Sequence, residues 1–194
     1  MHLKQIVIAS LAFSVALPVA AAEDPLPVEL TAFAVDLGNQ GRARTGTIQI
    51  RIDRWSTDEE RTALRDTLIE GGSDDLLKAL QKMKPSAGSI RTSDSLGWDI
   101  RYARQFELPG GGRRIVFATD RPMNFWEIAN SARSADYEFM VGEVRVDAEG
   151  KGEGKLVTRG KVKFNKESRT IEIENYGTEP VRLNKVRVEH TKSD

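Results

Sequence analysis

The sequence predicts a mainly β (α+β) fold, an antiparallel β-sandwich or barrel with an inserted helical hairpin at about residues 56–84. Apolar and polar residues alternate over much of 28–53 and 97–189, which is the period of half-buried strands. Between these regions the apolar residues recur with the period of a helix. Turn-forming segments rich in glycine and proline separate the alternating runs. These patterns predict about eight or nine strands in one domain.

The first two strands are predicted at VELTAFAVD (28–36) and TIQIRID (47–53). Every second residue of each segment is apolar, so one face of each strand is expected to enter the core. The residues expected to face inward are Val28, Leu30, Ala32, Ala34, Ile48, Ile50 and Ile52.

The helical hairpin is predicted from its caps and its apolar stripe. Ser56 and Glu59 have the spacing of a capping box, and Gly71-Gly72 is a typical helix end. A second helix follows in SDDLLKALQKMKP, and Pro85 ends it. Its apolar stripe consists of Leu76, Leu77, Leu80 and Met83.

The C-terminal half is predicted to be mostly strand. In GWDIRYARQFEL (97–108) alternation places Trp98, Ile100, Tyr102, Phe106 and Leu108 on one face. The segment 120–136 fits either a strand or a short helix.

One later hairpin is assigned a register. A turn centred on Lys166-Glu167 places Val162 opposite Ile171 and Lys161 opposite Glu172. Cross-strand charge pairing then explains the basic run RGKVKFNK without a polyanion site.

Residues 1–22 have the features of a cleaved secretory signal peptide. Lys4 precedes an apolar run over 6–17, and alanines at 20–22 supply the small residues that signal peptidase selects. The run is shorter than the roughly 20 residues of a membrane-spanning helix. We therefore expect an exported protein, periplasmic or extracellular, in which 23–194 form a single domain with no transmembrane span.

The composition excludes several functional classes. Because 29 Lys and Arg balance 29 Asp and Glu, nucleic-acid binding is not expected. The absence of cysteine excludes disulfides, thiolate catalysis and iron–sulfur clusters. The two histidines are His2, in the predicted signal peptide, and His190, near the C-terminus, which leaves a Ser-His-Asp triad little to be built on. No cofactor is expected.

The segment TDRPMNFWE supplies the candidate ligand-binding and catalytic residues. It combines charges and an aromatic residue in an irregular stretch, where binding residues tend to gather. A polar pocket lined by an aromatic ring is predicted from Asp99, Arg101, Arg121 and Trp126. Asp120 and Glu127 are the candidate carboxylate pair of a glycan hydrolase, which needs two carboxylates at a defined separation.

Two glycine-rich segments carry weaker hypotheses. In DAEGKGEGK (147–155), Asp147, Glu149 and Glu153 are candidate calcium ligands, although a glycine-rich connection between strands is the preferred interpretation. PGGGRR, at 109–114, is likewise interpreted as a hairpin turn rather than a phosphate loop, because a strand follows it.

Aromatic residues suggest a cavity for an apolar ligand if the strands close into a barrel. The residues concerned are Trp55, Trp98, Tyr102, Phe106, Phe117 and Phe125. The alternative is that they fill the core.

Two resemblances accompany these patterns. RTIEIENYGTEPVRLNKVRVE (169–189) is similar to a stretch of many immunoglobulin-like sandwiches. The series RWSTDEERTAL, GGRRIVFATDRP, NFWE and GEGKL resembles a family of exported bacterial proteins with no assigned activity. The second resemblance implies bacterial export and transfers no functional residue.

The function expected from the sequence is that of a non-enzymatic binding or interaction module for an unknown protein or small-molecule ligand. The alternatives are a carboxylate-dependent glycan hydrolase and a calcium-stabilised structural protein.

Overall fold

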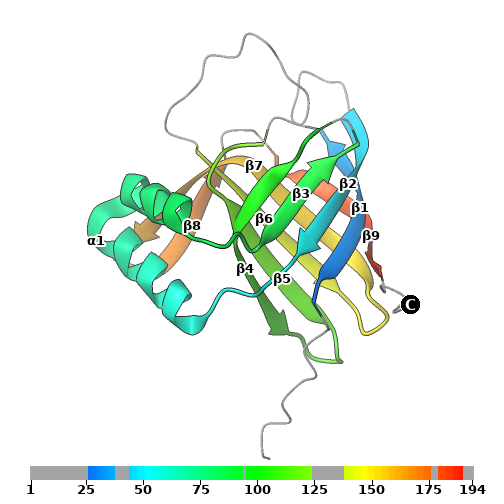
Figure 1. Cartoon of the computed structure of the whole chain (residues 1–194), viewed down its shortest axis with the longest axis horizontal. Helices are drawn as coiled ribbons and strands as arrows, with labels where there is room; N and C mark the ends of the chain where they lie inside the picture. Colours follow the sequence, from blue (N-terminus) through cyan, green and yellow to red (C-terminus); the bar gives the residue numbers. More distant parts are fainter. Residues whose placement is uncertain (1–25, 38–43, 94, 124–137, 176–178, 190–194) are drawn as a thin grey trace, which may run out of the picture.

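A computed structural model describes residues 26–37, 44–93, 95–123, 138–175 and 179–189 of the chain. It contains nine strands and one helix, and the helix lies between the second and third strands (Figure 1). The strands are β1 (Val28–Asp36), β2 (Arg44–Ile52), β3 (Gly88–Thr92), β4 (Trp98–Glu107), β5 (Arg113–Thr119), β6 (Phe139–Val146), β7 (Lys151–Asn165), β8 (Thr170–Asn175) and β9 (Val181–Glu189), and the helix is α1 (Asp58–Lys82).

The strands form an antiparallel barrel, which decides between the two predicted architectures. Eight strands close in the order β6-β5-β4-β3-β2-β1-β9-β7, and β7 pairs again with β6. The long strand β7 has two parts. Residues 151–157 pair within the ring, Gly160 pairs both with β6 and with β8, and residues 161–165 continue beyond the ring and pair with β8. The hairpin of β7 and β8 therefore projects from the barrel toward α1 (Figure 1).

The interior of the barrel is filled by side chains. The inward-facing residues predicted for the first two strands are confirmed, since none of them is more than 2% exposed. Phe117 is fully buried among them, and Gly142 makes room for it, because a Cβ at this glycine would lie 2.2 Å from the ring. Trp55 and Trp98 pack against the same cluster. These aromatic residues fill the core, as expected for a barrel of this strand number.

The predicted face of β4 is wrong beyond Ile100. The pairing of β4 with β5 shifts between Ile100 and Tyr102, which is a β-bulge. A bulge inserts one residue and turns the following side chains to the opposite face. Ile100 therefore lies inside the barrel, whereas Tyr102 packs outside it in the cluster below α1. Phe106 also lines that outer region, and Phe125 lies outside the described residues.

The predicted capping box is wrong by one residue. Thr57 is the N-cap, its side chain accepts from the backbone N–H of Glu60, and the Glu60 carboxylate accepts from the N–H of Thr57. Ser56 is instead buried against β4, where its Oγ accepts from the N–H of Ala103 at 3.2 Å. Because that hydroxyl anchors the chain to the barrel, the adjacent Thr57 starts the helix.

Gly72 divides α1 into two helical parts, as the glycine pair suggested. Its φ of 76° and ψ of −162° are not helical, and positive φ is readily adopted only by glycine. The parts before and after it form the layer beside the barrel in Figure 1. Leu68, Leu76 and Leu80 are its buried residues.

The predicted register of the β7–β8 hairpin is wrong by two residues. Val162 lies opposite Ile173, and Lys161 lies opposite Glu174. The turn begins at Asn165, whose side-chain oxygen accepts from the N–H groups of Glu167 and Ser168 at 3.0 and 3.2 Å. This local bonding moves the turn toward the C-terminus, while the even shift keeps the same residues on each face.

Within the described residues, no helix combines the length and the apolar character that crossing a lipid bilayer requires.

Candidate functional site

A largely apolar hollow lies between α1 and the outside of the barrel. This apolar groove has a volume of about 290 Å³. The described residues that line it are Arg61, Leu64, Arg65, Leu68, Leu76 and Leu80 of α1, together with Tyr102, Phe106, Val116, Ala118, Phe139, Val141, Val162, Ile171 and Ile173 of the strands. Arg61 and Arg65 are its charged lining residues and Tyr102 is its uncharged polar one. The other described lining residues have apolar side chains.

The groove is apolar because the strands beneath it carry apolar side chains on their outward face as well as on the face inside the barrel. In β5, Ile115 and Phe117 point inward, whereas Val116 and Ala118 occupy the alternate, outward positions and line the groove. The second hydrophobic cluster forms there, with Leu68, Leu76 and Leu80 of α1 packed against Phe139 and Val162. The side chains of this outer cluster do not fill all the space between α1 and the strands, and the groove is the space that stays open.

The β8 end of the groove leaves apolar surface in contact with water. Ile171 is 51% exposed and Ile173 is 45% exposed, although both line the groove. Large apolar residues that are buried on one side and exposed on the other are typical of a binding surface when they are contiguous. These two isoleucines therefore mark where further apolar surface can be covered.

The groove crosses the strands in their order around the barrel. Its lining residues come from β4, β5, β6, β7 and β8, which are successive neighbours. The beginning of α1 is attached at the β4 end, where Arg104 pairs with Asp58 at 3.0 Å and donates to the carbonyl of Ser56 at 3.0 Å. The groove thus has a β4 end, close to the start of the helix, and a β8 end.

Tyr102 is the uncharged polar residue at the β4 end. Burial raises the pKa of its hydroxyl, while Arg104 and Arg61 act in the opposite direction, and the net pKa shift is upward. The hydroxyl therefore stays protonated at neutral pH and is available as a hydrogen-bond donor.

Two further arginines, on β5 and β6, lie outside the set of residues that line the groove. The guanidinium of Arg114 lies 4.7 Å from the centre of the Phe106 ring, an attractive cation–π distance. Arg114 lies opposite Arg145 across β5 and β6. Both are close to Glu143, at 3.8 and 2.8 Å respectively. The Nε of Arg114 is buried without a hydrogen-bond partner.

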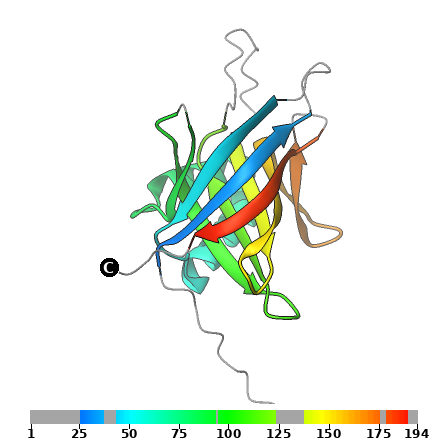
Figure 2. The ribbon, with the colours of Figure 1, turned by 90° about the vertical axis from the view of Figure 1, so that its right-hand side faces the viewer.

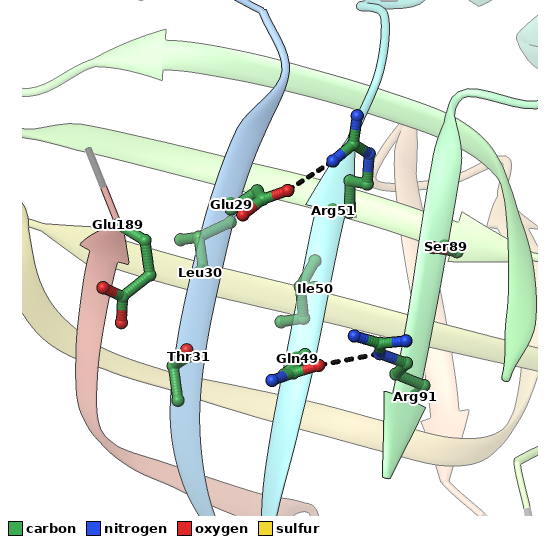
Figure 3. A pocket seen from close by; sticks show the side chains of 9 residues that line it. All are labelled: Glu29, Leu30, Thr31, Gln49, Ile50, Arg51, Ser89, Arg91 and Glu189. Atoms are coloured by element: carbon green, nitrogen blue, oxygen red, sulfur yellow. Dashed lines mark hydrogen bonds and ion pairs between the residues drawn. The ribbon is translucent and has the colours of Figure 1, made fainter. Parts of the chain in front are cut away.

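The part of the barrel formed by β9, β1, β2 and β3 is not covered by α1 (Figure 2). A second hollow lies over these strands (Figure 3). This polar surface has a volume of about 530 Å³. Its side chains are largely paired with one another. Arg51 forms an ion pair with Glu29, and Arg91 donates to Gln49 at 2.7 Å (Figure 3). Arg51 also pairs with Asp53, at 2.7 Å. Such exposed pairs on a sheet are an ordinary solvated face.

The structure brings part of the predicted polar pocket together. Arg101 joins two carboxylates, at 3.1 Å from Asp120 and 3.3 Å from Asp99. Arg121 instead donates to the carbonyl of Gly97 at 3.0 Å. Trp126 and Glu127 lie outside the described residues. Asp120 is therefore engaged by an arginine, and its role as half of a catalytic pair stays a prediction.

The glycine-rich segment 147–155 is mostly strand. The turn spans 147–150, and β7 begins at Lys151, so the connection is shorter than the sequence suggested. Asp147 closes the turn by accepting from the N–H of Lys151 at 2.8 Å. Glu153 lies within β7, opposite Arg145. Glu149 is exposed in the turn. In the described ranges, no three His, Cys, Asp or Glu residues gather closely enough to hold a metal ion.

The PGGG segment is also a turn. Leu108 N–H donates to the carbonyl of Gly112 at 2.8 Å, and Gly110 and Gly111 have φ of 89° and 83°. The strand β5 follows directly, with Arg113 at its start.

Comparison with protein-family models, curated proteins and solved structures gives no match for this chain. The function must therefore be inferred from the two surfaces. The apolar groove was not predicted from the sequence, although the uninterrupted apolar run IVFA in β5 is a signal of burial on both faces.

Proposed function

We propose that this is an exported, non-enzymatic binding protein, periplasmic or extracellular, whose apolar groove binds a linear hydrocarbon chain. The observation that carries the proposal is the hollow of about 290 Å³ lined almost entirely by apolar side chains. This volume equals that of roughly ten water molecules at ~30 Å³ each, so a chain of about ten carbon atoms is a suitable occupant.

The energetic argument favours a narrow apolar ligand. Covering Ile171 and Ile173 removes exposed hydrocarbon from water, which contributes about 25 cal/mol for each Å² buried. The lining residues come from packed strands and a capped helix, so little has to be ordered on binding. A bulky polar ligand gains nothing from such a lining.

Two features of the chain support the assignment to export and binding rather than catalysis. Residues 1–22 have a signal-peptide pattern, and the sequence contains no cysteine and a single histidine beyond that segment. The glycan hydrolase and the calcium-stabilised protein remain predictions from the sequence, and the described residues add no observation in favour of either.

The test is thermal unfolding with 1-decanol, an uncharged ten-carbon chain. At 100 times its dissociation constant a ligand adds about 2.7 kcal/mol of stability, which raises the midpoint of a domain of this size by roughly 5–10 °C. The variant Ala118→Trp fills the groove and should lose the shift. Gln49→Trp, on the polar surface, is the matched control and should keep it. No shift with any 1-alkanol of eight to sixteen carbons overturns the proposal.

A further inference from the structure

We propose that the natural ligand of the groove is a fatty acid, with its carboxylate at the β4 end beside Arg61 and Arg65 and its chain directed toward Ile171 and Ile173. This inference rests on the proposed function. It adds the charge of the ligand and its orientation, and both follow from how charges are distributed around the groove.

Among the described residues that line the groove, the charged ones lie on α1 and none lies on the strands. Arg61 and Arg65 lie four residues apart on α1, so their side chains are neighbours on the same helix face. No carboxylate is among the described lining residues. A guanidinium binds a carboxylate with two parallel hydrogen bonds, and an uncharged or cationic head group cannot accept them in this way.

Two arginines at the β4 end have one carboxylate partner in common, while Glu60 in the same helical turn is bound by Arg54. Arg61 and Arg104 share Asp58, at 3.8 and 3.0 Å. The side chain of Asp58 is 73% exposed, so water screens it and weakens both pairs. An additional anion between these groups would therefore find positive charge that is incompletely compensated.

The neighbouring strands repeat this imbalance. Arg114 and Arg145 share Glu143. Across β6 and β7, Lys155 lies opposite Glu143 and Glu153 lies opposite Arg145, which adds one charge of each sign and leaves the excess unchanged. On α1, Arg65 pairs with the adjacent Asp66 at 2.8 Å. Among the described residues that line the groove itself, the charged side chains are therefore those of Arg61 and Arg65.

The orientation follows from the contrast between the two ends. Tyr102 and Arg61 lie together at the β4 end, with Arg65 one helical turn further along α1, whereas the β8 end presents Ile171 and Ile173. A fatty acid has the same asymmetry, one anionic head and one apolar tail. The groove volume of about 290 Å³ accommodates one such chain and is too small for a protein helix with its side chains.

The experiment compares ligands of equal chain length and different heads. Dissociation constants are measured by calorimetry for decanoate, 1-decanol and decyltrimethylammonium with the purified protein at pH 8 and low salt. We expect decanoate to bind about tenfold more tightly than decanol, equivalent to about 1.4 kcal/mol. Decyltrimethylammonium should bind more weakly than either, and added salt should reduce the advantage of decanoate.

The double variant Arg61→Gln, Arg65→Gln tests the placement of the head. Both side chains are exposed, so the variant should fold, and far-ultraviolet circular dichroism checks this. Its affinity for decanoate should fall to that for decanol, while decanol binding is unchanged. Arg91→Gln, on the polar surface, is the control and should keep the preference.

The outcomes separate the two proposals. If decanol binds and decanoate has no advantage in the unmodified protein, the fatty-acid inference is overturned and the proposed function stands. If the double variant keeps the full preference, the placement of the head is wrong. If neither ligand binds, the proposed function itself fails.

Discussion

The two sides of the barrel differ in the polarity of their outward-facing side chains, whereas their inward-facing side chains are apolar on both sides. Over β9, β1, β2 and β3 the outward residues are polar, such as Gln49 and Arg51, and they pair with one another. Over β4 to β7 they include Val116 and Val141, which face α1 and the groove. Inward residues are apolar on both sides. The inward side chains of each strand thus form the core of the barrel, and the outward side chains determine whether the surface is a polar, solvated face or an apolar face packed against α1 and lining the groove.

The largest expected change in stability tests whether both sides of the barrel share one apolar core. Ile50 of β2 and Ile115 of β5 are 1% and 0% exposed on opposite sides of the barrel. Changing either to alanine should lower the free energy of unfolding by about 2–5 kcal/mol, because each leaves a cavity. Urea unfolding measures both. A cost for Ile115→Ala alone would mean that the side under the polar surface is not part of the same core.

The next largest change in stability tests the difference between the apolar outer surface under α1 and the polar surface. Leu68, on α1 above the groove, is 3% exposed, and Leu68→Ala should cost about 2–3 kcal/mol. Gln49→Ala, on the polar surface, should change stability by less than about 0.5 kcal/mol. Equal effects of the two changes in urea unfolding would remove the distinction between the surfaces.

The start of α1 offers a smaller effect. Thr57→Ala removes the side chain that accepts from the N–H of Glu60, which should cost about 1 kcal/mol. Thr57→Ser keeps the acceptor and is the control. If both variants unfold at the temperature of the parent, the capping box does not contribute to holding the helix over the groove.

The smallest effect depends on pH. The hydrogen bond from Arg54 lowers the pKa of the Glu60 carboxyl, and the backbone N–H of Thr57 adds to this. A depressed pKa in the folded state means that the stabilisation is present above the unfolded pKa and is lost as the pH falls through the folded one. Glu60→Gln should therefore be less stable than the parent at pH 7, by no more than about 1 kcal/mol. That difference should vanish in acid. A difference that persists unchanged at pH 2 contradicts the assignment.

The sequence was a good guide where alternation was strict and a poor one where single residues redirect the chain. β1 and β2 were predicted with the correct inward faces. β3 was missed because Ile90 is its one large apolar residue. A bulge after Ile100 reversed the rest of β4, and the turn set by the side chain of Asn165 shifted the register of the β7–β8 hairpin by two residues. Neither effect has a periodic signal.

The groove could not be derived from the sequence for a different reason. Its lining residues come from one helix and five strands, and most of them alone are ordinary core residues. Only the closure of the barrel by β6 and β7, which places β8 outside the ring, reveals that Val162 packs against α1 and that Ile173 lines the groove beside it. The polar candidates Asp99, Arg101 and Asp120 did come together, since two of them lie in one strand and the third ends its neighbour.

The position of β9 has a consequence for how the protein folds. This strand lies between β1 and β7, so pairing of residues 181–189 with residues 28–36 brings together segments far apart in the sequence. Contacts of such long separation form slowly, because a large loop must be ordered before they contribute. Until β9 is in place, β1 and β7 each present an unpaired backbone edge, the feature that promotes association between chains. During synthesis, this chain is therefore open to association with other chains until β9 has paired.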